Sequence, residues 1–575
     1  MRRLIYIFII GLLLCSYTWA DGSRYASKSL LSEGKWVKIR VDKTGIYKLS
    51  YADLKNMGFS APSKVSVHGY GGWPLDEDFS KEYIDDVPST PVWRGSDYLL
   101  FYGKGPVKWE YDSSSQTFVH TNNPYSLYGY YFVTDATPTN DMTSVAQASG
   151  ASTRITTYDD YLLHEQELVS VNQSGREFFG EDFSGARPRT ISTFSSIPGI
   201  TGADGKVTMR FISRINSGSG TASLSINDSE LLDITIPSIQ TVSSNVRSYT
   251  KAIPGTTTAL WKGSKSEKNN VVVSYSSSGH TNVRLDYIRM QFVRTLRPYG
   301  ACTFFRSLTS VGNASRFVIS EANSNTLVFD VTDALNVKRV EADLNGSELS
   351  FTIPAGRLRE FVLVQTNQTF PSPEVVGEVA SSNLHGLEQR DMIIISAPSL
   401  VQQAERLAVA HREKDGLTVE VVTPEAIYNE FSSGTPDATA YRRLMKMFYD
   451  RSSSLGNPPK YLLLFGDGIY DNRGISGEVQ GVSWSNMLLT FQSQESLNVY
   501  SYATDDYFAF LEDNSGSNFS RDKMCLGVGR FPIRTVTEAT QMVDKTISYM
   551  ENKDSGSWKN NVTFVADDGN NEDSF

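Results

Sequence analysis

The sequence predicts a multidomain protein in which β-rich N-terminal domains, including a β-sandwich, precede an α/β domain with a parallel sheet. Up to about residue 377, short apolar and polar alternations recur between Gly, Asn and Ser turns with almost no helical periodicity, which is typical of antiparallel β-structure. Beyond residue 390, continuous apolar runs alternate with segments of helical length, which is typical of parallel strands joined by crossover helices. The 575 residues are also too many for one hydrophobic core.

Residues 1–20 are predicted to be a signal peptide. The pair Arg2-Arg3 precedes an apolar run over 4–14, and the stretch 18–20 has small residues at the two positions that a signal peptidase reads. Cys15 would suit lipidation, but the residue before it is bulky where a small one is required. No later run approaches the roughly 20 apolar residues that a bilayer requires. We therefore expect an exported chain without a membrane span of its own.

The range 21–143 predicts a β-rich domain. Val37, Ile39 and Val41 alternate with two basic residues, which is typical of a strand with one face in solvent. The other elements expected here are strands at 46–49, 64–68, 98–102 and 130–133 and a short helix at 51–57, closed by Gly58.

The range 153–377 predicts a β-sandwich, and a linker rich in Ser, Thr and Gly separates it from the first domain. A hairpin is expected to join 340–344 to 348–353 through Asn345-Gly346, a dipeptide that favours a tight turn. The other strands are expected at 207–211, 222–226, 271–275, 283–292 and 328–331.

The range 388–575 predicts the α/β domain, with parallel strands at 392–395, 418–422 and 461–465. The first crossover helix is expected over 400–414, between Ser399 as N-cap and Gly416 as C-cap, and the helix before the third strand begins after Asp437. Ligands gather at the carboxyl ends of parallel strands, so Asp467 is a candidate cleft residue. An Asp between two glycines also simply suits a turn.

The charge balance argues against nucleic acid as a partner, because the net charge is −10 and no basic stripe offsets it. After the leader only Cys302 and Cys525 remain, too few for a disulfide scaffold. Cys302 and His280 together mimic the thiolate and imidazole of a cysteine peptidase. Because His280 lies in a Ser/Gly turn of the sandwich, well before the α/β domain, we expect a surface histidine and a core thiol instead.

Four stretches of the α/β range resemble the gingipain-type (C25) cysteine peptidases: 391–396, 428–443, 460–468 and 526–532. Together with the β-rich regions, the stretch 428–440 is more narrowly similar to the sortases of the Bacteroidetes type IX secretion system. This resemblance covers nearly the whole mature chain. It implies a caspase-like α/β domain of two subdomains and catalysis by a Cys/His dyad.

Members of this family are expected to remove the C-terminal secretion domain of exported cargo proteins and to transfer the cargo to a surface lipopolysaccharide. The resemblance implies an outer-membrane, cell-surface location beside other secretion-system proteins. It also places the family's dyad, in a Gly-His-Gly turn and at a later strand end, downstream of the strand expected at 562–566. No histidine of this chain lies in such a turn. We therefore expect an N-terminal portion with a truncated α/β domain and no catalytic residue of its own.

The resemblance also places Asp505, Asp506 and Tyr507 near the substrate cleft. A solvated acidic turn is the alternative interpretation of these residues. They are candidates for the cleft together with Asp467.

An acidic loop near the C-terminus offers oxygen ligands to a hard cation, and gingipain-type peptidases bind calcium. The predicted calcium ligands are Asp567, Asp568, Glu572 and Asp573. Their spacing does not match an EF-hand, and a solvated loop is the alternative. No other cofactor is expected.

Two functions of different classes remain open. The chain is either the N-terminal part of a sortase, a cysteine-type peptidase and transpeptidase, or a non-catalytic surface or secretion-complex scaffold with a caspase-like fold. The residues encoded after Phe575 discriminate between them: a Gly-His-Gly turn followed by a strand-end Cys supports the enzyme, and an in-frame stop supports the scaffold.

Overall fold

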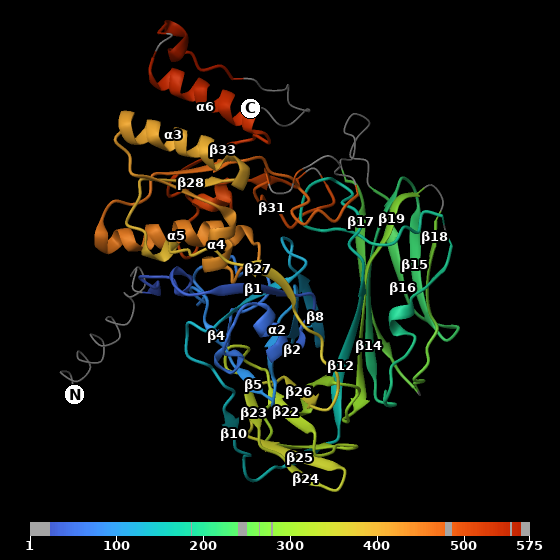
Figure 1. The fold of residues 1–575 in the computed structure, drawn as a ribbon. Coiled ribbons are helices and arrows are strands. Elements are labelled where there is room, and N and C mark those ends of the chain that lie inside the picture. The colour runs from blue at the N-terminus through green and yellow to red at the C-terminus, as the bar shows by residue number, and fades with distance from the viewer. Residues whose placement is uncertain are drawn as a thin grey trace, which may run out of the picture.

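The computed structural model describes residues 24–564, apart from 186, 240–249, 264, 278–279, 478–482, 484–485, 499 and 553–554. Figure 1 shows β-rich units followed by an α/β unit with a parallel sheet, which confirms the predicted fold class. The predicted signal peptide lies outside the described residues. Among the residues described, no helix is long and apolar enough to cross a membrane.

The first unit consists of two antiparallel sheets, ordered β27-β1-β9-β3-β4 and β2-β6-β5, and a hairpin, β7-β8. Its core includes Val37, Ile39 and Phe101. One strand comes from far along the chain, because Val37 of β1 pairs with Glu378 of β27. The elements are β1 (Trp36–Val41), β2 (Gly45–Ser50), α2 (Tyr51–Asn56), β3 (Ser66–His68), β4 (Ser89–Thr90), β5 (Val92–Arg94), β6 (Tyr98–Gly103), β7 (Val107–Asp112), β8 (Thr117–Asn122), β9 (Gly129–Thr134) and β27 (Glu374–Glu378).

The second unit is a sandwich of two four-stranded sheets, β12-β19-β14-β17 and β13-β18-β15-β16. Alternate residues of its strands point inward, as in β15, where Ala222, Leu224 and Ile226 join the core and the residues between them are partly exposed. The strands are β12 (Thr157–Glu165), β13 (Arg189–Thr190), β14 (Gly205–Ile215), β15 (Ser219–Ile226), β16 (Ser229–Pro237), β17 (Ile253–Trp261), β18 (Val271–Ser276) and β19 (His280–Thr295).

A third unit has a separate core, built around Phe305, Phe317 and Phe361. Its sheets are β10-β23-β22-β26-β20 and β11-β21-β25-β24. The predicted hairpin is confirmed, since Asn345 pairs with Glu348 and the turn between them contains Gly346 at φ +60°. The range 153–377 therefore holds two β-layered cores, and the division into domains by residue number stays a prediction. The strands are β10 (Ser144–Val145), β11 (Thr153–Ile155), β20 (Cys302–Phe305), β21 (Ser315–Ile319), β22 (Thr326–Asp330), β23 (Lys338–Val340), β24 (Asp343–Asn345), β25 (Glu348–Ile353) and β26 (Phe361–Gln365).

The α/β unit is built on the four-stranded sheet β29-β28-β30-β33, in which every pair is parallel. The three strands expected from apolar runs are confirmed as β28, β29 and β30. In Figure 1, α3 and α6 cover one face of this sheet and α4 and α5 cover the other. The elements are β28 (Met392–Ser396), α3 (Val401–Lys414), β29 (Val419–Val422), α4 (Pro424–Phe431), α5 (Ala438–Leu455), β30 (Tyr461–Phe465), β31 (Phe491–Gln492), β32 (Ala503–Thr504), β33 (Gly527–Phe531) and α6 (Val536–Met550).

The predicted helix ends of this unit are partly confirmed. Asp437 caps α5 by accepting a hydrogen bond from the backbone N–H of Thr439 at 2.8 Å, and Gly416 follows α3 at φ +66°. The N-cap at Ser399 is wrong, because α3 begins at Val401 and the Ser399 hydroxyl donates instead to Asn486 Oδ1 at 2.6 Å.

The strand predicted over 562–566 is also wrong in its described part. Residues 561–564 form no strand or helix, and Phe564 is 91% exposed. Residues 565 and 566 lie outside the described part of the chain. The apolar run Val562 to Phe564 therefore does not pack into the sheet formed by the described residues.

Helices α4 and α5 lie between the parallel sheet and the first unit (Figure 1). This arrangement corrects the expectation that the basic face of β1 is in solvent. Lys38 is buried, and its Nζ donates to Glu425 Oε1 at 2.8 Å and to Asn429 Oδ1 at 3.0 Å on α4. Burial lowers the pKa of Lys38, although the Glu425 carboxylate opposes the shift.

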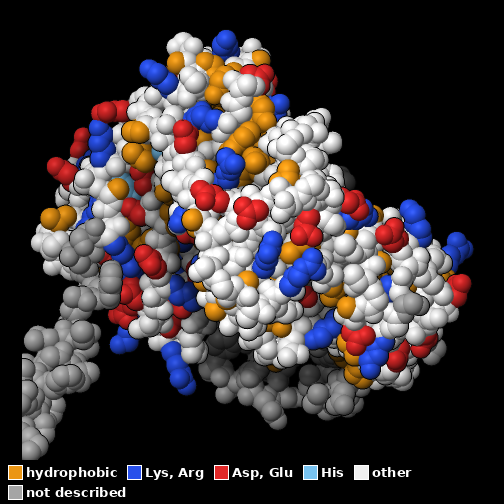
Figure 2. Space-filling model, turned by 90° about the horizontal axis from the view of Figure 1, so that it is seen from below, with side chains coloured by type: hydrophobic (Ala, Val, Ile, Leu, Met, Phe, Trp, Pro, Cys, Tyr) orange, Lys and Arg blue, Asp and Glu red, His pale blue; other side chains and the backbone are white. Residues whose placement is uncertain are grey.

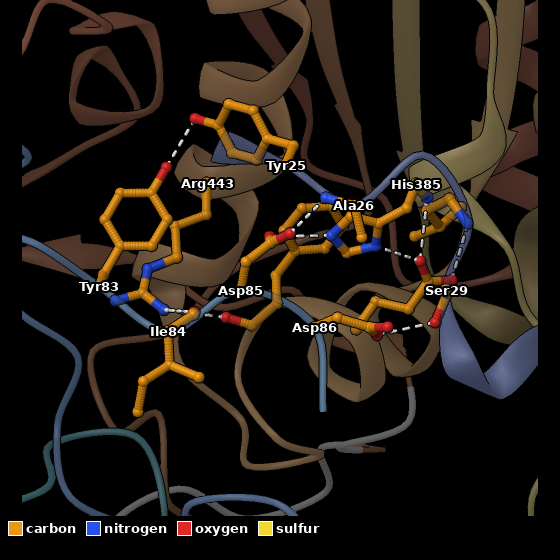
Figure 3. A network of polar contacts seen from close by, with 12 residues as sticks. Tyr25, Ala26, Ser29, Tyr83, Ile84, Asp85, Asp86, His385 and Arg443 are labelled. Atoms are coloured by element: carbon orange, nitrogen blue, oxygen red, sulfur yellow. Dashed lines mark hydrogen bonds and ion pairs between the residues drawn. The ribbon is translucent and has the colours of Figure 1, made fainter. Parts of the chain in front are cut away.

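A second polar network joins the same two units, with His385 at its centre (Figure 3). Its Nδ1 lies 2.7 Å from the buried carboxylate of Glu430 on α4, and its Nε2 lies 2.9 Å from Asp85 of the first unit. Burial disfavours the imidazolium, but hydrogen bonds and attraction to Asp85 and Glu430 raise the pKa of His385 to about 9. In the same view the Asp85 carboxylate accepts a hydrogen bond from the backbone N–H of Ala26, and the Asp86 carboxylate accepts one from the Ser29 hydroxyl. These contacts attach the N-terminal segment to the first unit, and the Tyr25 hydroxyl also donates to Asp450 of α5 at 2.8 Å.

Candidate functional site

The candidate site is a cavity of about 410 Å³ at the carboxyl ends of β29, β28 and β30. Pro424, Pro398 and Ile469, which follow these three strands, form its floor. The facing wall is the stretch 125–130, the end of the β8–β9 connection together with the first two residues of β9, called loop 125–130 below. Parallel α/β sheets place their ligand sites at this edge, so the position itself favours a binding role.

Aromatic and apolar side chains dominate this cavity. Tyr128, Tyr130 and Tyr428 line it, and Leu127 lines it with 43% of its surface exposed. The Tyr428 ring is held by a stack on Tyr441, at 5.6 Å between centroids, and by a hydroxyl contact of 2.6 Å to the same residue. Burial raises the pKa of Tyr428 well above its ordinary value, so the hydroxyl stays neutral. Such a surface suits an apolar or aromatic side chain of a peptide.

The polar groups of the cavity are few and mostly paired within the protein, although the buried Nε of Arg473 has no partner. Arg473, only 2% exposed, makes a bidentate ion pair with Glu167 of the sandwich, with both N–O distances at 2.6 Å. Asn472 donates from Nδ2 to the Thr490 carbonyl and accepts the Thr490 backbone N–H, at 3.0 Å each. These contacts fix the loop after β30 and leave the aromatic wall open for binding.

Asp467 lies at the carboxyl end of β30, as predicted, and its side chain is engaged within the protein. Its Oδ1 accepts the backbone N–H of Gly468 at 2.8 Å, and its Oδ2 pairs with the guanidinium of Arg534. The turn-forming interpretation of Asp467 is therefore supported by its contacts. A role in substrate binding stays a prediction.

Asp505 lies beside the neighbouring strand end and is bound by an arginine of β33. Arg530 donates from Nε and Nη2 to the two carboxylate oxygens of Asp505, at 2.9 and 2.8 Å. Its two terminal nitrogens also reach the carbonyls of Gly466 and Leu489, at 3.3 and 3.2 Å. Arg530 therefore ties the ends of β30 and β33 to two loops.

Asp506 and Tyr507 are adjacent in sequence, but their side chains differ in exposure. Asp506 is exposed, whereas Tyr507 is completely buried. The Tyr507 ring stacks on Phe491 at 3.7 Å between centroids, and its hydroxyl lies 2.9 Å from Thr439 Oγ1. Tyr507 is a packing residue in this structure, and only Asp505 and Asp506 of the segment keep partly or fully exposed side chains.

Sequence reasoning missed the loop 125–130 and the arginines that hold the strand ends. Nothing local in the run of tyrosines shows that it faces a sheet more than 250 residues later. The sequence offers one signal for Arg530, its place near the end of a predicted strand. Its contact with Asp505 is seen only in the structure. The cavity could not be predicted from the sequence, because it forms only where the first unit packs on the α/β unit.

The pair His280 and Cys302 does not form a dyad. Strand β19 rises about 3.3 Å per residue, so His280 lies roughly 50 Å from Thr295 at the other end. The stretch from Thr295 to Cys302 spans at most about 25 Å, so the backbone positions 280 and 302 stay at least about 25 Å apart. Burial raises the pKa of the Cys302 thiol to about 12, which disfavours the nucleophilic thiolate.

The described residues contain no group of three or more His, Cys, Asp or Glu side chains arranged to hold a metal ion. The predicted calcium ligands, Asp567 to Asp573, lie outside the described residues. A calcium site there stays a prediction.

Comparison with known proteins agrees with the fold. The model of Peptidase family C25 matches residues 385–575. The crystal structure of dimeric latent PorU from Porphyromonas gingivalis superposes with a TM-score of 0.84 at 38% identity, over 94% of this chain and 51% of that chain. The chain therefore spans about half the length of that protein.

Other solved structures are far less similar. The CBM35 module of Abf62 from Cellvibrio japonicus aligns at 16% identity over 24% of this chain and 97% of that chain, with a TM-score of 0.12, and supports no inference. No curated protein matches the sequence. The match of residues 385–575 to the family model and the similarity of 94% of this chain to PorU identify a PorU-type protein with a C25 peptidase region.

Proposed function

We propose that the chain is the N-terminal part of a type IX secretion system sortase. In this proposal the whole protein is a cysteine-type peptidase and transpeptidase that removes the C-terminal secretion domain of cargo proteins and attaches them to surface lipopolysaccharide. The observation that carries the proposal is the extent of the similarity to PorU, which includes the β-rich units as well as the C25 region.

The aromatic cavity is the part of the site that these residues contribute. It lies at the carboxyl ends of three parallel strands, and Leu127 presents an apolar side chain to it. In the proposal it binds an apolar side chain of the cargo near the scissile bond. The dyad would come from residues beyond this sequence.

Location and partners belong to the same proposal. The protein is proposed to be exported and to work at the outer membrane, on the cell surface, beside other secretion-system proteins, with cargo proteins and a lipopolysaccharide acceptor as partners. On the face seen in Figure 2, acidic and basic side chains are interspersed with hydrophobic ones. Such a surface suits protein partners better than nucleic acid.

The alternative is a non-catalytic scaffold in the secretion complex. It is favoured by the histidine side chains that the structure describes, whose partners are carboxylates, hydroxyls and backbone carbonyls and never a cysteine sulfur. A fold alone does not decide between the two functions.

Deletion of the gene in its own organism tests the proposal, with a cargo protein followed by mass spectrometry for its C-terminal domain and for attached lipopolysaccharide. We expect unprocessed cargo to accumulate and the intact gene to restore processing. Leu127→Asp should slow processing by about tenfold, because a carboxylate replaces an apolar contact of the cavity. Leu344→Asp is the matched control, since Leu344 is exposed to a similar degree on a distant hairpin. Normal processing of the cargo after deletion of the gene would contradict the sortase function and leave the scaffold function as the alternative.

A further inference from the structure

A second cavity, of about 350 Å³, lies where the first unit, the sandwich and the α/β unit meet. It is separate from the aromatic cavity in its chemistry, because charged side chains from all three units line it. Its main polar groups are His120 and Asn122 on β8, Glu165 on β12, Arg210 on β14, Asp286 on β19 and Asp437 at the start of α5.

The sandwich side of this cavity has more carboxylates than cations. Arg210 forms ion pairs with two of these carboxylates, because its Nη1 lies 2.7 Å from Glu177 and also contacts Asp286. Glu165 lies close enough to raise the pKa of Asp286 by repulsion. One guanidinium therefore faces three carboxylates, of which Asp286 is only 5% exposed and Glu165 only 11%.

Two further side chains have a buried polar atom without a partner. His120 is 6% exposed, and its Nε2 lies 3.0 Å from Glu165, while Nδ1 has no partner. Asn122 donates from Nδ2 to Glu165 at 2.9 Å, while Oδ1 has no partner. Asn122 donates its N–H to the carboxylate and keeps its carbonyl oxygen as an unpaired acceptor, while Nδ1 of His120 is also unpaired.

The remaining cations of the cavity are only partly paired, because the buried Nη2 of Arg176 and Nε of Arg289 have no partner. Arg176 pairs with Glu77 at 2.7 Å and donates to the Gln492 carbonyl at 2.7 Å. Arg289 lies over the Tyr287 ring at 4.8 Å, and its buried Nε has no partner. Arg289 therefore leaves one donor for an acceptor group of a ligand, such as a backbone carbonyl.

We propose that this cavity binds a primary ammonium or guanidinium group, the end of a lysine or arginine side chain of a peptide. A cation with several N–H donors satisfies the unpartnered carbonyl oxygen of Asn122 and compensates the excess carboxylate charge. An organic cation fits better than a metal ion, because no group of three metal-ligating side chains is arranged here among the residues described. This inference goes beyond the proposed sortase function and does not depend on it.

The ionisation of Asp286 adds a pH signature. Burial, and then the charges of Glu165 and Glu177, raise the pKa of Asp286 to about 7, although Arg210 opposes the shift. A bound cation favours the carboxylate, so binding releases a proton from the fraction of Asp286 that is protonated. The affinity is therefore expected to be higher at pH 8 than at pH 6.

Calorimetric titration of the whole chain tests this binding, with Nα-acetyl-lysine methylamide as the probe and Nα-acetyl-norleucine methylamide as the uncharged control. We expect heat of binding from the lysine probe only, stronger at pH 8. Glu165→Gln should weaken binding by about tenfold or more, since it removes one charge and disturbs the contacts that hold His120 and Asn122. Glu181→Gln is the matched control, because Glu181 forms a similar pair with His164 at 2.7 Å in the same sandwich but does not line the cavity.

Equal heats from the two probes, or no heat from either at millimolar concentration, would overturn the inference. The comparison of probes uses the unmodified protein, so it decides even if Glu165→Gln does not fold. An unchanged affinity in a folded Glu165→Gln variant would also overturn it.

Discussion

Helices α5 and α6 cover opposite faces of one parallel sheet and meet very different surroundings. Most of α5 is buried, including Arg442, because the first unit packs on the side that faces away from the sheet. On α6 only Ala539 and Val543 are buried, and Tyr549 is 57% exposed. Both helices have an apolar face at helical spacing, so the pattern predicts which face meets the sheet. It does not predict whether a second unit covers the other face.

The largest effect of this difference is expected at Arg442. Its guanidinium donates to the carbonyls of Phe510, Glu77 and Ser515, each at 2.7 Å, and lies 4.0 Å from the centroid of the Phe79 ring. Arg442→Ala removes the donors of three carbonyl groups, two of them in buried hydrogen bonds, and should lower the free energy of unfolding of this unit by about 4 kcal/mol.

Urea denaturation followed by near-UV circular dichroism measures this loss. Arg406→Ala on α3 is the matched control, because Arg406 is 43% exposed and should change stability by less than about 0.5 kcal/mol. A loss of similar size in the two variants would remove the contrast between the two sides of the sheet.

A second expected effect concerns hydrogen exchange. Val536, Tyr549 and Trp558 are each at least half exposed, and a helix that buries little apolar area opens more easily. Amides of α6 should therefore exchange at least about a hundredfold faster than those of β30, which corresponds to about 3 kcal/mol. If mass spectrometry shows that the amides of α6 and β30 are equally protected from exchange, α6 is packed as stably as the buried strand.

A third, smaller effect is the pH dependence of the network around His385. Its pKa is raised to about 9 in the folded protein, so the charged form contributes stability that is fully present below about pH 6.5. This contribution is lost as the pH rises towards 9, and we expect it to amount to about 2 kcal/mol.

Thermal unfolding at pH 6 and pH 9 measures this loss, and His385→Gln should flatten the difference. His411→Gln is the matched control, since His411 forms an exposed pair with Asp415 on α3. The same pH slope in His385→Gln and the unmodified protein would show that His385 does not cause it.

The smallest effect is expected at Arg534, which pairs with Asp467 but is 55% exposed. Arg534→Ala should change the free energy of unfolding by no more than about 0.5 kcal/mol, because exposed ion pairs contribute little. Denaturation in urea checks the value. A loss above about 2 kcal/mol would show that this strand end is held as tightly as the α5 side.

The sequence predicted what depends on local pattern. The runs at 392–395 and 461–465 are apolar on both faces, as buried parallel strands require, and Asn345-Gly346 specifies its turn through backbone conformation alone. Both predictions are confirmed, because the conformation of these segments follows from local sequence and not from a distant residue.

Contacts between distant units could not be predicted in this way. Lys38 has the alternation of a solvated face, but its partner Glu425 lies 387 positions later. The same holds for the candidate site: the sequence located the strand end at Asp467, whereas the facing wall of loop 125–130 depends on how the first unit packs. Ser399 has good capping chemistry, yet its hydroxyl bonds to Asn486 instead.

The pairing of β1 with β27 has a consequence for how the chain reaches its native state. Arg40 on β1 meets Glu374 on β27, 334 positions later, so the first sheet cannot be completed before that strand has emerged. Such a long loop closes slowly, although each doubling of its length costs only about 0.6 kcal/mol more. Until then β1 has an unpaired hydrophobic edge, which is prone to pair with another chain. During N-to-C emergence, a holdase chaperone that masks β1 should therefore increase the yield of native protein.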